Sequence, residues 1–149
     1  MKMYALSLWQ PWASLVVLGL KSIETRNWGT ARRTFARKLV GQRLAIHAAQ
    51  RKDRDPWYHI AMATNRNLAI ELRQMGHDPD HLPMGRLLGH VRVDDARVLT
   101  RDDTLAALCR CSSLFGLVVS DPIALPAPPP CSGHQGFWHV DLPDLEARP

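Results

Sequence analysis

The N-terminal stretch of residues 6–28, LSLWQPWASLVVLGLKSIETRNW, constrains the fold more than any other part of the chain. The largely apolar residues 3–8 predict a short strand. The apolar segment after them starts at Pro11 and ends at Gly19, which predicts a short helix, because proline is tolerated in a first helical turn and glycine is common just past a helix end. A short strand followed by a short helix predicts a mixed fold rather than an all-helical one.

A charged strand is expected directly after this helix. Residues 22–26 alternate, so that Ile23 and Thr25 face one way while Glu24 and Arg26 face the other. Three charged side chains, Lys21 included, therefore follow one of the most hydrophobic segments of the chain. They form either a solvated edge or the polar end of a pocket.

Length and composition fit one compact domain over residues 1–149, because 46% of the residues are hydrophobic and can form a core. The longest apolar run, residues 13–20, is far shorter than the ~20 residues of a membrane span, so no membrane partner is expected. The N-terminus lacks the small-residue cleavage pattern of a signal peptide. Three cysteines, an odd number, favour a reducing cytoplasm over a disulfide framework.

The rest of the chain predicts several short elements separated by glycine and proline. Residues 28–41, WGTARRTFARKLVG, show no clear periodicity and predict a long basic loop. One helix is expected from Asp55-Pro56 to Gly76, and a shorter one at residues 102–109. Further strands are predicted at residues 43–48 and at 86–93, where Gly89 permits a bulge or bend. Two strand fragments are expected at 115–125 around a turn at Asp121-Pro122, and a final strand at 136–142 follows the stiff connector 126–130.

These elements predict an α+β fold around a small, partly open β-barrel. A doubly wound fold is disfavoured, because strands and helices do not alternate regularly.

Positive charge is concentrated in residues 21–54. This segment holds ten Lys/Arg and two Asp/Glu, a net charge of +8, whereas the remaining residues hold nine basic and twelve acidic side chains, a net of −3. Such a concentration favours an anionic partner, most simply a nucleic acid or a nucleotide phosphate. The alternative is a solvated basic loop that keeps the protein soluble.

Four blocks of the sequence together resemble the ASCH domain, a branch of the PUA-like superfamily. They are residues 6–28, RLAIHAA, LPMGRLLGHVRVDDARVL and FGLVVSDPIALPAPPPCSGHQGFWHV, in that order. The resemblance covers nearly the whole chain except a helical insertion of variable length around residues 51–81. It implies a PUA-like β-barrel of about six strands, with flanking helices and a cleft lined by the Gln-Pro-Trp helix start and the Lys/Glu/Arg strand.

The resemblance also suggests what the cleft does. Most members are regarded as RNA- or nucleotide-binding modules, and a few bacterial ones look like ribonucleases or amidohydrolases that act on an acylated cytidine. The amidohydrolase-like members carry a threonine nucleophile three residues after the lysine, where this chain has Glu24. We therefore expect Glu24 to hold a ligand rather than to attack it.

Candidate residues follow from these patterns. The ligand-binding set is Trp12, Lys21, Glu24, Arg26 and Trp28, and the phosphate-contacting set is Arg32, Arg33, Arg37, Lys38 and Arg43.

If the protein is an enzyme, Lys21, Glu24 and His47, which is expected near a strand end, are the catalytic candidates. Each has a structural alternative: Lys21 and Glu24 as an ion pair, Glu24 and Arg26 as part of a barrel-stabilising network, and His47 as a core histidine.

Other features carry less functional information. Trp9 and Trp138 are expected to be packing residues. Cys109, Cys111, Cys131 and His134 have poor spacing for zinc, so no metal and no cofactor is predicted. Phosphate-loop and dinucleotide-binding motifs are absent. Three functions stay open: an RNA- or nucleotide-binding module, a small hydrolase of RNA or a modified nucleoside, and a protein-interaction module that uses the connector or the Trp57 helix.

Overall fold

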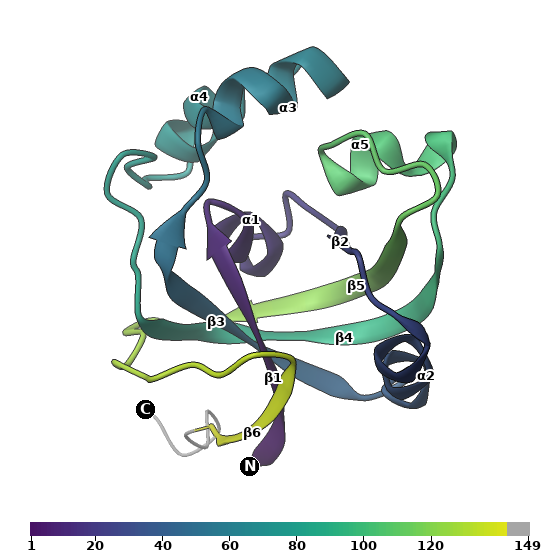
Figure 1. Ribbon diagram of the computed structural model, residues 1–149. Coiled ribbons are helices and arrows are strands. Elements are labelled where there is room, and N and C mark those ends of the chain that lie inside the picture. Colours follow the sequence, from purple (N-terminus) through teal and green to yellow (C-terminus); the bar gives the residue numbers. More distant parts are fainter. Residues whose placement is uncertain (143–149) are drawn as a thin grey trace.

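A computed structural model describes residues 1–142 (Figure 1). Its elements in chain order are β1 (Lys2–Gln10), α1 (Trp12–Val17), β2 (Ile23–Arg26), α2 (Thr30–Lys38), β3 (Arg43–Lys52), α3 (Pro56–Thr64), α4 (Leu68–Gln74), β4 (Arg86–Val98), the 3-10 turn η1 (Arg101–Asp103), α5 (Thr104–Ala107), β5 (Phe115–Ala124) and β6 (Phe137–Asp141). The α+β class predicted from the sequence is confirmed.

Six strands form one sheet in the order β2-β5-β4-β3-β1-β6. β1 and β3 run parallel, and the other neighbours run antiparallel. Within residues 1–142, β2 and β6 are edge strands that do not pair with each other, so the sheet is not closed into the expected barrel.

Helix α1 lies inside the curve of this sheet, where it contacts β1, β3, β4 and β5 (Figure 1). Residues 13–17 of this helix are buried, and most of their side chains join the apolar core. The helix ends where Gly19 adopts a φ of +79°, a conformation that other residues rarely take. The strand, helix and strand predicted at the N-terminus are confirmed.

Residues 28–41 contain a helix, α2, so the predicted long loop is wrong. Phe35, Ala36 and Leu39 lie at helical spacing and pack against the core, while arginines cover the outer face. Phe35 makes aromatic contacts with Tyr4 and Phe137, at ring-centroid distances of 5.0 and 5.2 Å. Because arginines surround these three apolar residues in the sequence, the helical periodicity of the segment is hard to detect.

The single helix expected between Asp55-Pro56 and Gly76 is two helices, α3 and α4. Asn65 adopts a left-handed conformation with φ of +59° and ends α3. Asn67 then starts α4 by accepting a hydrogen bond from the Ile70 amide at 3.2 Å. Two asparagines thus break an apolar pattern that otherwise continues through both helices.

The long strands β4 and β5 pair through two irregularities. Gly89 precedes the first, and a Cβ on it would lie 2.1 Å from the Ile123 carbonyl oxygen. The β3–β4 pairing shifts register at Gly89, and the first β4–β5 irregularity follows between His90 and Arg92, so the predicted bulge or bend is confirmed. Opposite it, Asp121 takes a φ of +48° inside β5, so the expected turn at Asp121-Pro122 is an irregularity in one continuous strand.

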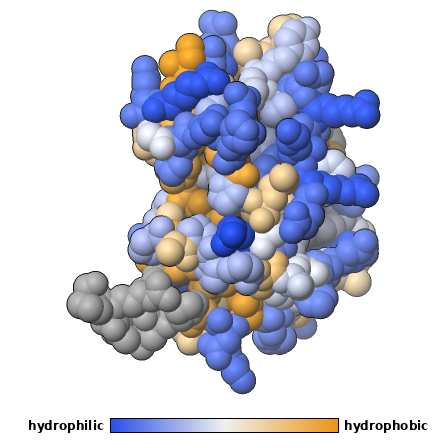
Figure 2. All heavy atoms as spheres, turned by 90° about the vertical axis from the view of Figure 1, so that its left-hand side faces the viewer, coloured by the Kyte–Doolittle hydropathy of each residue, from blue (hydrophilic) through white to orange (hydrophobic). Residues whose placement is uncertain are grey.

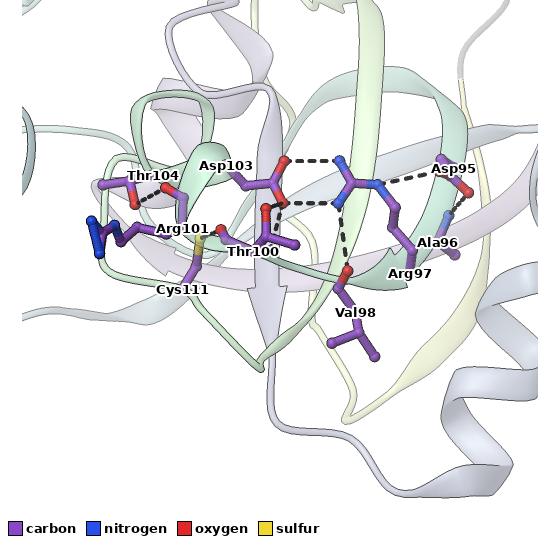
Figure 3. Close-up of polar contacts among 9 residues, drawn as sticks. All are labelled: Asp95, Ala96, Arg97, Val98, Thr100, Arg101, Asp103, Thr104 and Cys111. Carbon is purple, nitrogen blue, oxygen red and sulfur yellow. Dashed lines mark hydrogen bonds and ion pairs between the residues drawn. The ribbon is translucent and has the colours of Figure 1, made fainter.

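An ion-pair cluster fixes the end of β4 to η1 (Figure 3). Two nitrogens of the Arg97 guanidinium donate to the two oxygens of Asp103, both at 2.8 Å, and the Thr100 amide donates to the same carboxylate at 2.8 Å. Asp95 approaches Arg97 from the other side at 3.3 Å. The hydrogen bonds from Arg97 and Thr100 hold the pKa of Asp103 well below its usual range.

None of the helices formed by residues 1–142 has the length and apolar character needed to cross a lipid bilayer.

Candidate functional site

The main cleft, with a volume of about 840 Å³, lies between β1, β3, the β2–α2 junction and the loop that precedes β6. That loop, residues 131–136, runs beside β1 (Figure 1). Within the described part of the chain, the lining includes two arginines and two histidines but no aspartate or glutamate. The residues are Leu6, Ser7, Trp9, Arg26, Trp28, Arg32, His47, Ala49, Gln50, Gly85, Cys131, Ser132, Gly133, His134, Gln135 and Gly136.

His47 and Ser7 form the polar floor of the main cleft. His47 is buried in the middle of β3, not near the strand end that the sequence predicted. Its Nε2 lies 2.7 Å from the Cys131 carbonyl oxygen, which can only accept, so Nε2 carries a proton and donates. In the neutral ring Nδ1 then accepts from the Ser7 hydroxyl at 3.0 Å. Trp138 Nε1 donates to Ser7 Oγ at 3.3 Å and closes the network.

The loop 131–136 touches this floor through a glycine. A Cβ on Gly133 would lie 2.5 Å from the His47 ring and 2.6 Å from Ser7 Oγ, so only glycine lets the backbone pass here. The ring of His134, an exposed residue, packs edge-on against Trp138 at a centroid distance of 5.3 Å. The loop therefore brings a second histidine to the cleft.

Arg26 links β2 to β1 at the edge of the main cleft. Its guanidinium donates to the Ser7 carbonyl oxygen at 3.0 Å, lies 5.7 Å from the Trp28 ring centroid and pairs with Glu24 at 3.5 Å. Glu24 and Arg26 thus share one strand face, as the alternation predicts. Glu24 does not line the cleft, and its Oε2 is buried without a hydrogen-bond partner among residues 1–142.

Lys21 and Trp12 lie away from the main cleft. Lys21 is 2% exposed, donates to the Ala107 carbonyl oxygen and lies 5.1 Å from the Trp12 ring centroid. Trp12 Nε1 in turn donates to Asp53 at 3.0 Å. The five residues of the expected ligand-binding set are therefore divided, with only Arg26 and Trp28 on this cleft.

The five predicted phosphate contacts are also spread over the surface. Arg32 lines the main cleft. Arg33 and Arg37 lie over the Phe115 ring at 5.2 and 5.3 Å. Lys38 is exposed in the last turn of α2. Arg43 pairs with Asp121 at 2.9 Å and donates a hydrogen bond to His90 Nδ1 at 2.9 Å.

Several cleft residues were not singled out from the sequence. Trp9, expected to be a packing residue, is 46% exposed and lies under the Arg51 guanidinium at 5.5 Å. Ser7, Gln50 and His134 carry no sequence signal of their own, because the fold brings them together from distant segments. The alternation in β1 does place Trp9 on the same side as Ser7, which is the one available hint.

No group of three or more His, Cys, Asp or Glu residues within residues 1–142 is placed to bind a metal ion. Cys131 and His134 belong to the cleft loop, whereas Cys109 and Cys111 lie near α5.

Comparison with known proteins agrees with this architecture. Residues 6–123 match the family model described as the ASCH domain. One similar solved structure is that of ASCH from Zymomonas mobilis, which is 13% identical, covers 85% of this chain and 72% of that chain, and superposes with a TM-score of 0.49. A serine-to-alanine mutant of the Zymomonas mobilis protein is 12% identical over 93% of this chain and 87% of that chain, with a TM-score of 0.50. Because the family model covers most of the sequence, the chain belongs to the ASCH domain family.

Proposed function

We propose that this ASCH domain binds single-stranded RNA and holds one nucleotide of it in the main cleft. The observation that carries the proposal is the lining of that cleft, which among residues 1–142 combines two arginines and two histidines with no carboxylate. The two guanidinium groups attract phosphate, the histidines add polar hydrogen-bonding groups, and the low dielectric of the cleft walls strengthens the attraction.

In this proposal, different residues around the cleft contact the phosphate, the base and the remaining polar groups of the nucleotide. Arg32 is exposed at the rim, where its planar guanidinium is suited to two hydrogen bonds to one phosphate. The exposed Trp9 ring offers a flat surface for a base, and such stacking contributes ~1–3 kcal/mol for any base. Gln50, Gln135 and Ser132 supply neutral donors and acceptors around these two groups.

Fluorescence anisotropy with labelled single-stranded RNA tests the proposal. We expect binding at about 50 mM salt that weakens as the salt concentration rises, because each phosphate contact contributes about −0.7 to the slope of log affinity against log salt. Arg32→Ala should weaken binding and make this slope shallower by about 0.7.

Arg92→Ala is the matched control, since Arg92 is an exposed arginine on β4 that pairs with Asp94 and does not line the cleft. It should bind RNA as the wild type does. Absence of RNA binding at about 50 mM salt, or equal losses in the two variants, would contradict the proposal.

The geometry favours binding over hydrolysis. Lys21 and Glu24, the main catalytic candidates, do not line the main cleft, and both nitrogens of His47 already have partners within the protein. RNA cleavage or deacylation of an acylated cytidine that is lost in both Lys21→Ala and Glu24→Ala would instead support the hydrolase.

A further inference from the structure

A second cleft, of about 830 Å³, lies between the end of β1, the turn from β3 to α3 and the loop before β4. Much of its lining is apolar and flat. This part consists of Pro11, Pro56, Trp57, Pro79, Leu82 and Met84. A cavity of this size with aromatic and proline walls fits a planar ring.

The two clefts are separated only by a thin wall. Trp9 lines the main cleft and its neighbour Gln10 lines the second cleft. Likewise, Gly85 lines the main cleft and its neighbour Met84 lines the second cleft. On β3, Gln50 and Lys52 line different clefts, and two residues of a strand span about 7 Å.

Arg51, stacked on Trp9 at 5.5 Å, lies on this wall, which we call the Trp9–Arg51 ridge.

The ridge and the rim of the second cleft carry three basic side chains free for phosphate. Arg51, Lys52 and Arg54 are exposed, and none of them forms an ion pair with another residue of the range 1–142.

The carboxylates of the second cleft are mostly occupied by protein partners. Asp53 accepts from Trp12 Nε1 at 3.0 Å and from the Arg54 amide at 2.8 Å. Asp80 pairs with Arg73 at 3.6 Å. The neutral donors to Asp53 leave its charge in place, so Asp53 and Asp55 carry two negative charges beside the three positive charges of Arg51, Lys52 and Arg54, and the net charge that an arriving strand meets at the ridge is positive.

We infer that the second cleft is a binding site for the neighbouring nucleotide of the same RNA strand. The phosphate between the two nucleotides crosses the Trp9–Arg51 ridge, where Arg51 and Lys52 contact it, and the next base enters the second cleft against Trp57. The inference rests on the proposed function, because it requires the first nucleotide to occupy the main cleft. It makes the ligand an oligonucleotide rather than a free nucleotide.

Length dependence of binding tests this inference. Affinities for a mononucleotide, a dinucleotide and a hexanucleotide of the same base are measured by titration calorimetry with the wild type, with Arg51→Ala/Lys52→Ala and with Arg92→Ala. For the wild type and the control, we expect at least a tenfold gain in affinity between one and two nucleotides, because a stacked base and a phosphate contact are added. The double variant should lose most of this gain and keep mononucleotide affinity.

Photocrosslinking gives a second test of the inference that uses only the wild-type protein. A hexanucleotide with 4-thiouridine at each position in turn is irradiated on the wild-type protein, and the linked peptides are identified. Linkage to residues 52–57 or 79–84, from a position next to one that links to residues 131–136, supports the inference.

Failure of the inference and failure of the proposed function give different results. Equal affinity for one and six nucleotides that is still lowered by Arg32→Ala leaves the main cleft as the binding site and overturns the second. Linkage confined to the main cleft does the same. Hexanucleotide binding that is insensitive to Arg32→Ala overturns the proposed function itself.

Discussion

Gln10 shows how a single side chain positions the start of α1. Its Nε2 donates to Ser14 Oγ and to the Pro83 carbonyl oxygen, both at 2.7 Å, and its Oε1 accepts from the Ser14 amide at 3.0 Å. Gln10 is only 2% exposed, so these groups have no access to water as a substitute partner. The glutamine of the Gln-Pro-Trp motif is thus bonded to the protein itself.

Replacement of Gln10 by leucine should therefore destabilise the protein. We expect a loss of about 2 to 4 kcal/mol in the free energy of unfolding, because the Ser14 amide and the Pro83 carbonyl lose their partner inside the protein. Urea unfolding measures it, with Gln42→Leu as control. Gln42 is exposed, so its change should stay within ~0.5 kcal/mol. An unchanged urea midpoint in Gln10→Leu would contradict this account.

His90 makes stability depend on pH. Burial, and after it the positive charge of Arg43, lowers the pKa of His90 below its ordinary value of 6.5. The unfolded chain therefore takes up the proton at a higher pH than the folded protein does. The stability that neutral His90 contributes is fully present above about pH 6.5 and is lost as the pH falls through the lowered value.

His90→Gln should remove this part of the pH dependence, because glutamine offers an oxygen acceptor to Arg43 but does not titrate. Melting temperatures between pH 5 and 8 give the comparison, with the exposed His59→Gln as control. We expect the wild type and the control to lose stability on acidification more steeply than His90→Gln. Parallel curves of melting temperature against pH for all three proteins would show that His90 does not cause the loss of stability on acidification.

At the scale of elements, strong local patterns were the most predictable. The sequence predicts α1 and β6 correctly, because each has a clear apolar pattern and a glycine or proline near an end, and it predicts β2 correctly from the alternation of its side chains. The errors at α2 and between α3 and α4 have a common physical cause. In both places the structure depends on a few residues that an analysis of hydrophobic periodicity does not detect. They are a narrow apolar stripe in α2 and a left-handed asparagine between α3 and α4.

The junction between β4 and η1 gives a prediction at this scale. Asp103→Asn removes the charge that faces Arg97 (Figure 3), so the melting temperature at pH 7 should fall by a few degrees. The pKa of Asp103 is lowered on folding, so its contribution is present above the unfolded value near 3.8 and is lost at lower pH. The difference between wild type and variant should accordingly stay constant from pH 7 to about pH 4 and shrink as the pH is lowered further to 3.

Asp94→Asn is the matched control at this junction. Its partner Arg92 is 56% exposed and lies 3.6 Å away, a geometry that contributes little. A difference between wild type and Asp103→Asn that stays constant over the whole pH range would contradict the ion-pair explanation.

At the scale of the whole molecule, the composition of the site was not predictable from the sequence. The concentration of positive charge in residues 21–54 pointed to an anionic partner, but the fold distributes that charge. Arg32 lines the main cleft, Arg51 lies on the ridge, and Arg43 is bonded to Asp121 at the far end of β3. The main cleft combines β1, β3 and a loop more than eighty residues later, and only the sheet order brings them together.

The surface reflects this distribution. Figure 2 shows the face on the left-hand side of Figure 1, where hydrophilic side chains gather along the right-hand margin and apolar groups are exposed between them and the opposite margin.

The position of β1 in the sheet has a consequence for synthesis on the ribosome. Of the six strands of this sheet β1 is made first and β6 last, yet the two are neighbours that pair as far as Asp141. Translation at the usual rate needs roughly 7 to 28 s to pass from one strand to the other. During this interval one edge of β1 lacks the neighbour that it has in the folded sheet, so we expect this edge of the nascent chain to be open to incorrect strand pairing until β6 is made.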